Sequence, residues 1–121
     1  MNILKKKKVL LAEDDASMRR FTEIILQKAG FEVLTAEDGL AAMQIAVTGN
    51  IDALVADAIM PNMSGYDLCR IVSAQSSKKK IPCIILSGLA ENNSDNEVAD
   101  IFLVKDTNLK EQLLAALDKL L

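Results

Sequence analysis

Histidine and tryptophan are absent from this sequence of 121 residues, which has only two cysteines, two prolines and one tyrosine. Without histidine, the chain lacks the commonest general base and a usual ligand of zinc and iron. Cys69 and Cys83 stand in apolar surroundings and lack the spacing of metal ligands, so we interpret both as small buried thiols rather than as a disulfide or a redox pair. A metal site in this chain would therefore rely on oxygen ligands.

Long apolar runs are also missing. None approaches the roughly 20 residues of a membrane span, and the apolar residues after Lys8 run directly into Glu13, which argues against a secretory leader. The net charge of −3 argues against a nucleic-acid binder that relies on a basic face. The basic run Lys5 to Lys8 would suit anionic lipid or nucleic acid, but we favour the simpler interpretation of a solvated arm. We expect a soluble, cytoplasmic protein with no nucleic-acid or membrane partner.

Apolar residues alternate between strand and helix patterns along the chain. Five short runs are typical of buried strands, at Val9–Ala12, Phe31–Ala36, Ile51–Ala56, Ile81–Leu86 and Ile101–Val104. Helical spacing follows four of them, at Met18–Ala29, Leu40–Val47, Leu68–Val72 and Leu109–Leu120, with Gly30 and Gly49 as stops and Thr107 as the last N-cap. This α/β alternation with short connections predicts a parallel sheet covered by helices on both faces, in one domain of residues 1–121.

The segment Glu91–Glu97 interrupts this alternation, because its sequence is Glu-Asn-Asn-Ser-Asp-Asn-Glu, without an apolar residue. The fourth helix belongs here by topology. A helix that packs on a sheet needs an apolar stripe, which these residues cannot provide. We therefore predict a short, irregular or missing fourth helix.

Polar side chains stand at the carboxyl ends of four predicted strands. They are Glu13, Asp14 and Asp15 after the first strand, Asp57 after the third, Ser87 and Gly88 at the fourth, and Lys105 after the fifth. Ligands of open parallel sheets bind at this edge, so these groups should converge. Clustered carboxylates repel one another, and a hard cation such as Mg²⁺ relieves that repulsion. A lysine beside the metal suits a phosphoryl group as a second positive charge, which predicts a magnesium site that also takes a phosphoryl group.

Four stretches resemble the receiver domains of response regulators in two-component signalling, and the chemotaxis regulators in particular. Val-Leu-Leu-Ala-Glu-Asp-Asp at 9–15 looks like the first strand and acidic pair of that family. Asp-Ala-Ile-Met-Pro-Asn-Met-Ser-Gly at 57–65 resembles its phosphoacceptor loop and is the most specific of the four. Residues 81–88 and 102–105 look like its fourth and fifth strands. The resemblance covers nearly the whole chain and implies a flavodoxin-like, doubly wound, five-stranded parallel sheet of order 2-1-3-4-5.

The resemblance also implies a role for each acidic residue. Glu13 and Asp14 would hold Mg²⁺, largely through waters, with Asp15 a less critical neighbour. Asp57 would ligate the metal and attack the phosphorus of a partner's phosphohistidine. The backbone carbonyl of Ile59 would complete the protein ligands. Because this chain has no histidine, the phosphohistidine would have to come from a histidine kinase or a histidine phosphotransfer protein.

Further roles implied by the resemblance concern the phosphoryl group and the switch. Lys105 would neutralise one phosphoryl oxygen, and Ser87 would donate its hydroxyl to another. Backbone amides of Ala58 and Gly88 would assist. Phe102 would be the switch aromatic, turning inward when Ser87 moves toward the phosphoryl group.

Three departures from the family pattern affect the output side of the domain. Asp106 replaces the usual proline after Lys105, and since a cis bond before a non-proline residue costs about 3 kcal/mol, we predict a trans peptide and a shifted loop. Lys105 follows Ser87 by only 18 residues, with the deletion in the polar segment. Phe102 lacks the hydroxyl of the tyrosine common in the family, so any switch would rest on packing.

We therefore expect a stand-alone phosphoacceptor switch that is not a conventional enzyme and that signals through an unknown downstream protein, since no output domain follows Leu121. The alternative is a receiver-like interaction module that no longer switches by phosphorylation, which Asp106 and the polar segment favour. Two other classes fit less well. A flavodoxin-type cofactor binder would find its phosphate repelled by Glu13–Asp15, and a haloacid-dehalogenase-type hydrolase would carry its aspartate after the first strand.

Overall fold

Five strands and four helices make up the part of the chain that the computed structural model describes, residues 5–75, 80–88 and 99–121. In chain order they are β1 (Lys8–Ala12), α1 (Ala16–Lys28), β2 (Glu32–Ala36), α2 (Gly39–Thr48), β3 (Ala53–Asp57), α3 (Gly65–Gln75), β4 (Cys83–Ser87), β5 (Ile101–Val104) and α4 (Leu109–Leu120). All strand pairs are parallel, in the order β2-β1-β3-β4-β5, which confirms the predicted sheet. The fourth helix expected near Glu91–Glu97 lies outside the described residues.

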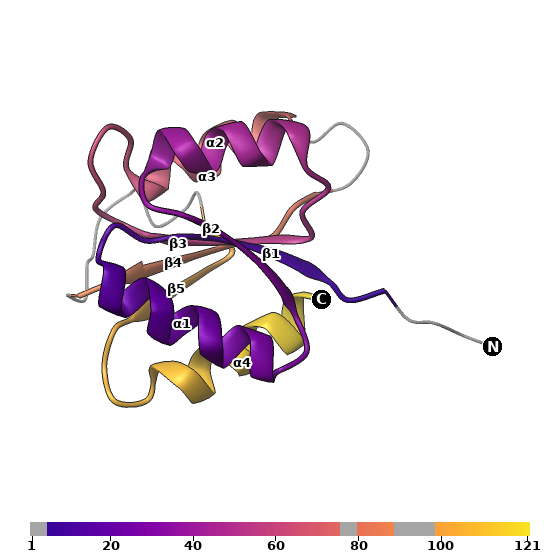
Figure 1. Ribbon diagram of the computed structural model, residues 1–121, viewed down its shortest axis with the longest axis vertical. Coiled ribbons are helices and arrows are strands. Elements are labelled where there is room, and N and C mark those ends of the chain that lie inside the picture. The colour runs from indigo at the N-terminus through magenta and orange to yellow at the C-terminus, as the bar shows by residue number, and fades with distance from the viewer. Residues whose placement is uncertain (1–4, 76–79, 89–98) are drawn as a thin grey trace.

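Helices cover both faces of the sheet: α2 and α3 lie on one side and α1 and α4 on the other (Figure 1). Successive residues of each strand point to opposite faces of the sheet. Leu10, Leu54 and Ile85 belong to the apolar cluster beneath α2 and α3, whereas Val9 and Val55 belong to the cluster beneath α1 and α4. Because both faces are buried, the central strands read as continuous apolar runs rather than as alternating ones.

The ends of the helices match the sequence prediction at two positions and differ at a third. Gly30 follows α1 with a φ of +99°, the left-handed conformation that favours glycine. Gly49 ends α2 in an extended conformation. The prediction that Thr107 caps the last helix is wrong, because α4 begins after Asn108, which makes no capping side-chain bond. The carboxylate of Asp106 instead accepts the N–H of Asn108 at 2.9 Å and forms the turn before the helix.

Cys69 on α3 and Cys83 on β4 are both buried and both free, as the sequence predicted. They contribute to the cluster beneath α2 and α3 as small apolar groups. In the described ranges, no helix has the length and apolar character needed to cross a membrane.

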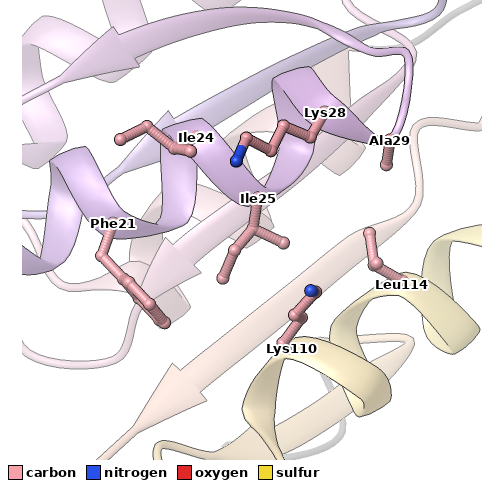
Figure 2. Close-up of a pocket in the computed structure, with 7 residues that line it drawn as sticks. All are labelled: Phe21, Ile24, Ile25, Lys28, Ala29, Lys110 and Leu114. Atoms are coloured by element: carbon pink, nitrogen blue, oxygen red, sulfur yellow. The ribbon is translucent and has the colours of Figure 1, made fainter.

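A surface pocket of about 380 Å³ lies between α1 and α4 (Figure 2). Its lining consists of Phe21, Ile24, Ile25, Lys28, Ala29, Lys110 and Leu114. The Phe21 side chain is 53% exposed here, although the sequence pattern placed it on the apolar face of the helix. The pocket shows that this apolar face is wider than the part of it that the sheet covers.

Candidate functional site

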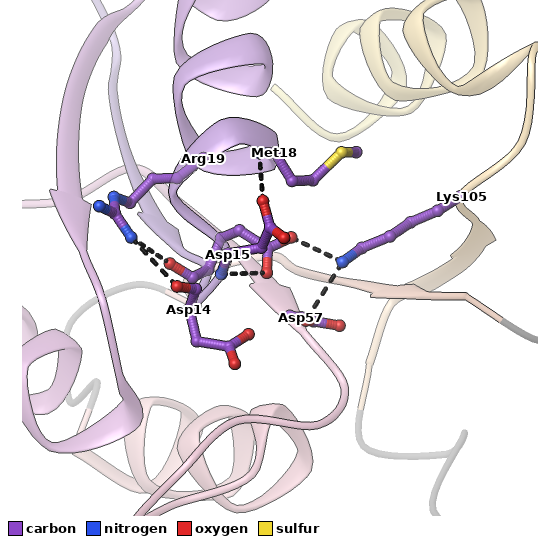
Figure 3. A network of polar contacts seen from close by, with 7 residues as sticks. Asp14, Asp15, Met18, Arg19, Asp57 and Lys105 are labelled. Atoms are coloured by element: carbon purple, nitrogen blue, oxygen red, sulfur yellow. Dashed lines mark hydrogen bonds and ion pairs between the residues drawn. The ribbon is translucent and has the colours of Figure 1, made fainter.

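Groups from the ends of several strands meet at one edge of the sheet, as the sequence predicted (Figure 3). Glu13 follows β1 directly, Asp57 is the last residue of β3, and Lys105 follows β5 directly. The parallel register places these ends level with one another, since Asp57 pairs with Leu86 on β4 and the next residue, Ser87, pairs with Val104 on β5.

Three carboxylates form a compact acidic group. One oxygen each from Glu13, Asp14 and Asp57 lie within 4.8 Å of one another. Glu13 is buried, Asp57 is half-buried and Asp14 is exposed, so the group opens to solvent on the side of Asp14. Oxygen ligands with partial solvent access are the donor set that Mg²⁺ prefers, because this ion keeps several of its waters. The residues present therefore fit a magnesium ion.

Lys105 bridges two of these carboxylates. Its Nζ lies 2.6 Å from Oε1 of Glu13 and 3.1 Å from Oδ2 of Asp57. The lysine side chain is 18% exposed, so the pairs are only weakly screened by water. The ammonium thus lies next to a carboxylate oxygen of Asp57.

Electrostatics within the site depend on burial. Burial raises the pKa of the Glu13 carboxyl to about 7; the hydrogen bond from Lys105 acts in the opposite direction, and neighbouring Asp57 adds to the rise. Burial would lower the pKa of Lys105, but its hydrogen bond to Glu13 and the charge of Asp57 outweigh that effect and raise it. The lysine stays protonated, and Glu13 is a carboxyl whose proton a divalent cation would displace near neutral pH.

Asp15 has a structural role rather than a place in the acidic group. Its Oδ1 accepts the N–H of Met18 at 2.8 Å, which makes it the N-cap of α1. Its own N–H points to Oε2 of Glu13 at 3.3 Å. The expectation that Asp15 is the less critical of the acidic neighbours stays a prediction.

The loop after Asp57 is held closely against the end of β3. Gly65, where α3 begins, donates its N–H to the carbonyl of Ala58 at 3.0 Å. A Cβ atom at Gly65 would lie 2.1 Å from the carbonyl oxygen of Asp57, so only glycine fits. Asn62 in the same loop has a φ of +72° and donates to Asp38 at the start of α2, 3.3 Å away. These contacts fix the backbone that carries Asp57.

The assigned roles of the remaining predicted site residues stay predictions. Ser87 is buried, Gly88 is exposed, and the Ile59 side chain is 72% exposed. The N–H of Ala58 donates to the carbonyl of Leu86 at 2.8 Å and would have to leave this partner to assist a phosphoryl group. Phe102 is half-buried and packs against the cluster beneath α2 and α3.

The peptide between Lys105 and Asp106 is trans, as predicted, because the described residues contain no cis bond. The N–H of Asp106, which a proline would lack, donates to the carbonyl of Val104 at 2.9 Å. The N–H of Lys105 donates to the carbonyl of Ser87 at 2.7 Å. Backbone bonds on either side of Lys105 thus direct its side chain toward the acidic group.

Two features escaped the sequence analysis. Arg19 donates from Nη1 to the carbonyls of Glu13 and Asp14, at 3.0 and 3.5 Å. Arg19 stands five and six residues after Asp14 and Glu13, and a lone arginine on a helix is usually solvated, so its position in the sequence offered little reason to single it out. The pocket between α1 and α4 could have been suspected only from the breadth of the apolar stripe on α1.

Comparison with known proteins gives a consistent result. The sequence profile described as the response regulator receiver domain matches residues 9–118. Chemotaxis protein CheY of Pseudomonas aeruginosa is 36% identical over 93 residues, which are 76% of this chain and 75% of the relative. The structure of chemotaxis response regulator CheY4 of Vibrio cholerae, crystallised at low pH, superposes with a TM-score of 0.88 at 34% identity, covering 97% of this chain and 100% of the other.

Another similar structure is that of response regulator TrrA from Thermotoga maritima in complex with Mg²⁺ and beryllium fluoride. It has a TM-score of 0.87 at 27% identity and covers 95% of this chain and 99% of the other. Some relatives are longer. The chain spans 34% of the length of the probable transcriptional regulator ycf27 of Galdieria sulphuraria, to which it is 37% identical over 90 residues.

Proposed function

Because this chain belongs to the response regulator receiver domain family, we propose that it is a signalling switch in which Asp57 accepts a phosphoryl group from a phosphohistidine partner. Receiver domains of this family are signalling proteins rather than conventional enzymes. The observation that carries the proposal is the meeting of three carboxylate oxygens within 4.8 Å, with the ammonium of Lys105 3.1 Å from Asp57. An ordinary ion pair on a protein surface does not require a third carboxylate beside the two that share the lysine.

The geometry supports the following chemistry. A carboxylate oxygen of Asp57 attacks the phosphorus of the donor, a P–O bond forms as the P–N bond breaks, and the imidazole of the partner leaves and takes up a proton. Lys105 remains beside the same oxygen and neutralises charge on the phosphoryl group. Glu13, Asp14 and Asp57 would hold Mg²⁺, which when bound would supply charge that offsets the repulsion between carboxylate and phosphoryl oxygens.

Phosphorylation would signal by changing contacts with another protein. Ser87 and Lys105 are joined through a backbone bond of 2.7 Å, and Phe102 lies on the same edge strand as the residues that lead to Lys105. A hydroxyl and an ammonium drawn toward a phosphoryl group would therefore pull on β5. The donor would be a histidine kinase or a histidine phosphotransfer protein. The downstream partner would bind the surface on the β4–β5 side of the domain.

Intact-mass spectrometry after incubation with Mg²⁺ and acetyl phosphate tests the proposal. We expect one phosphoryl group per chain, lost after chelation of the metal during incubation and lost in Asp57→Asn. Asp67→Asn is the matched control, since Asp67 is an exposed aspartate on α3 that pairs with Arg70 and lies outside the acidic group. Labelling of Asp57→Asn equal to that of wild type would contradict the proposal, and no labelling of wild type would favour an interaction module that no longer switches.

A further inference from the structure

Arg19 on α1 contacts the backbone of the loop that carries the acidic residues (Figure 3). Its Nη1 lies 3.0 Å from the carbonyl oxygen of Glu13 and 3.5 Å from that of Asp14. The side chain reaches back toward the start of the helix, the direction that long side chains on helices prefer. One guanidinium nitrogen thus holds two consecutive carbonyls just before the N-cap, Asp15.

Helix stability does not account for a cation at this place. The amino end of a helix carries partial positive charge, so acidic side chains are favoured there and basic ones are disfavoured. The first turn of α1 contains no acidic residue, and Arg19 follows immediately after it. The next residue, Arg20, points to solvent with 66% of its side chain exposed and pairs with Glu23 at 3.0 Å. The two neighbouring arginines therefore have different surroundings.

We propose that Arg19 is a positioning residue that holds the Glu13–Asp14 backbone so that both carboxylates point at the Mg²⁺ site. The inference rests on the proposed function, because it concerns the same metal. The Glu13 side chain is also restrained by the N–H of Asp15 and by Lys105, at 3.3 and 2.6 Å. Asp14 is exposed, and Arg19 holds the backbone from which its carboxylate projects. Partners of this kind, one step removed from a metal, commonly change its affinity 10- to 100-fold.

Positioning and charge have opposite consequences for Mg²⁺ affinity. A guanidinium near the site repels a divalent cation, so removal of its charge alone would tighten Mg²⁺ binding. Loss of the two carbonyl contacts would free the loop and weaken binding, because the carboxylates would have to be ordered at the moment of binding. The sign of the change in Arg19→Gln therefore separates the two effects.

Calorimetric titration with Mg²⁺, without any phosphodonor, measures this sign. We expect the dissociation constant of Arg19→Gln to rise about 10-fold relative to wild type. Arg19→Lys, which keeps the charge and one possible carbonyl contact, should lie between the two. Arg20→Gln, the matched control, should bind as wild type does. Arg19→Gln that binds Mg²⁺ as tightly as wild type, or more tightly, would overturn the proposal.

Amide hydrogen exchange in the metal-free protein gives a second readout that does not depend on metal or phosphoryl chemistry. The N–H groups of Asp14 and Asp15 should exchange several-fold faster in Arg19→Gln, whereas those of the strands should be unchanged. Unchanged exchange in this loop would also refute the proposal. Wild type that binds Mg²⁺ but takes no phosphoryl group would count against the proposed function alone and leave the role of Arg19 supported.

Discussion

The carboxyl ends of β3 and β5 contribute the nucleophile and the cation of the same site, but their surroundings differ. β3 pairs with β1 and β4, and its first four residues are completely buried. In the described residues β5 pairs with β4 alone, and its four residues are all half-buried. Asp57 therefore sits on a rigid element, whereas Lys105 follows a strand at the edge of the sheet.

This difference indicates how the domain can change conformation while the acidic group stays in place. Moving a strand in the middle of the sheet disturbs packing on both of its neighbours, whereas an edge strand shifts with fewer broken contacts. Asp57 lies at the central position, and Lys105, which would respond to a phosphoryl group under the proposed function, follows the strand that moves more easily. Four substitutions test this contrast, from the largest expected effect to the smallest.

Gly65→Ala should be the most damaging change, because its Cβ would lie 2.1 Å from the carbonyl oxygen of Asp57 at the rigid end. We expect unfolding free energy to fall by roughly 3 kcal/mol or more, with loss of phosphoryl uptake. Urea unfolding and intact-mass spectrometry measure the two effects. Gly88→Ala is the control for stability, since no heavy atom of the described residues lies within 4 Å of a Cβ at that position. Equal stability of the two variants would show that the β3 end is less rigid than the contrast requires.

Lys105→Met tests the cation on the edge side. Since Nζ is 3.1 Å from Asp57 and 2.6 Å from Glu13, we expect phosphorylation by acetyl phosphate to slow by about 100-fold. Mg²⁺ should bind more tightly, because a competing positive charge is removed. Rate assays and calorimetry measure these opposite changes. Lys110→Met, on the exposed side of α4, serves as control; a Lys105→Met variant with slower transfer but weaker Mg²⁺ binding would contradict the assigned charge role.

The pKa of Glu13 predicts a pH dependence of stability in the metal-free protein. Its folded-state pKa of about 7 lies above the ordinary value of 4.5, so the folded state binds the proton more tightly. Stability from this group is complete below pH 4.5 and is lost as the pH rises through 7, by about 3 kcal/mol in total. Glu13→Gln should remove this slope, as should excess Mg²⁺, which favours the ionised carboxylate. Chemical unfolding at several pH values tests it, and an identical slope in Glu13→Gln would assign the dependence to other groups.

Asp106→Pro should have the smallest effect, because it alters only the turn after the edge strand. Proline removes the N–H that donates to Val104 and the carboxylate that accepts from Asn108, both at 2.9 Å. We expect a loss of about 1 kcal/mol in thermal unfolding, with phosphoryl uptake retained. Asp106→Asn keeps the backbone N–H and a side-chain oxygen that can accept from Asn108, so its stability should be unchanged. If Asp106→Pro took up no phosphoryl group, the position of Lys105 would depend on this turn. The position of Lys105 would then be less tolerant of change than expected after an edge strand.

Sequence patterns were enough to predict the strand order of the sheet and which residues lie at its carboxyl edge. Asp57 and Lys105 could be placed there because each directly follows a short apolar run, and parallel strands bring such positions together. The N-cap of α4 was misassigned because Asp106, Thr107 and Asn108 are all capable of capping, and only the backbone conformation decides among them. Arg19 was missed because a hydrogen bond to a carbonyl leaves no signature in residue type.

The contact between Lys105 and Glu13 joins residues 92 positions apart, the longest separation among the site contacts. Glu13 and Asp57 are brought together by β1 and β3, whereas the cation that bridges them follows β5. Closing so large a loop is slow compared with forming the local helices. The like charges of the two carboxylates are therefore compensated by Lys105 only when β5 has paired with β4, and the complete site depends on the last strand of the sheet.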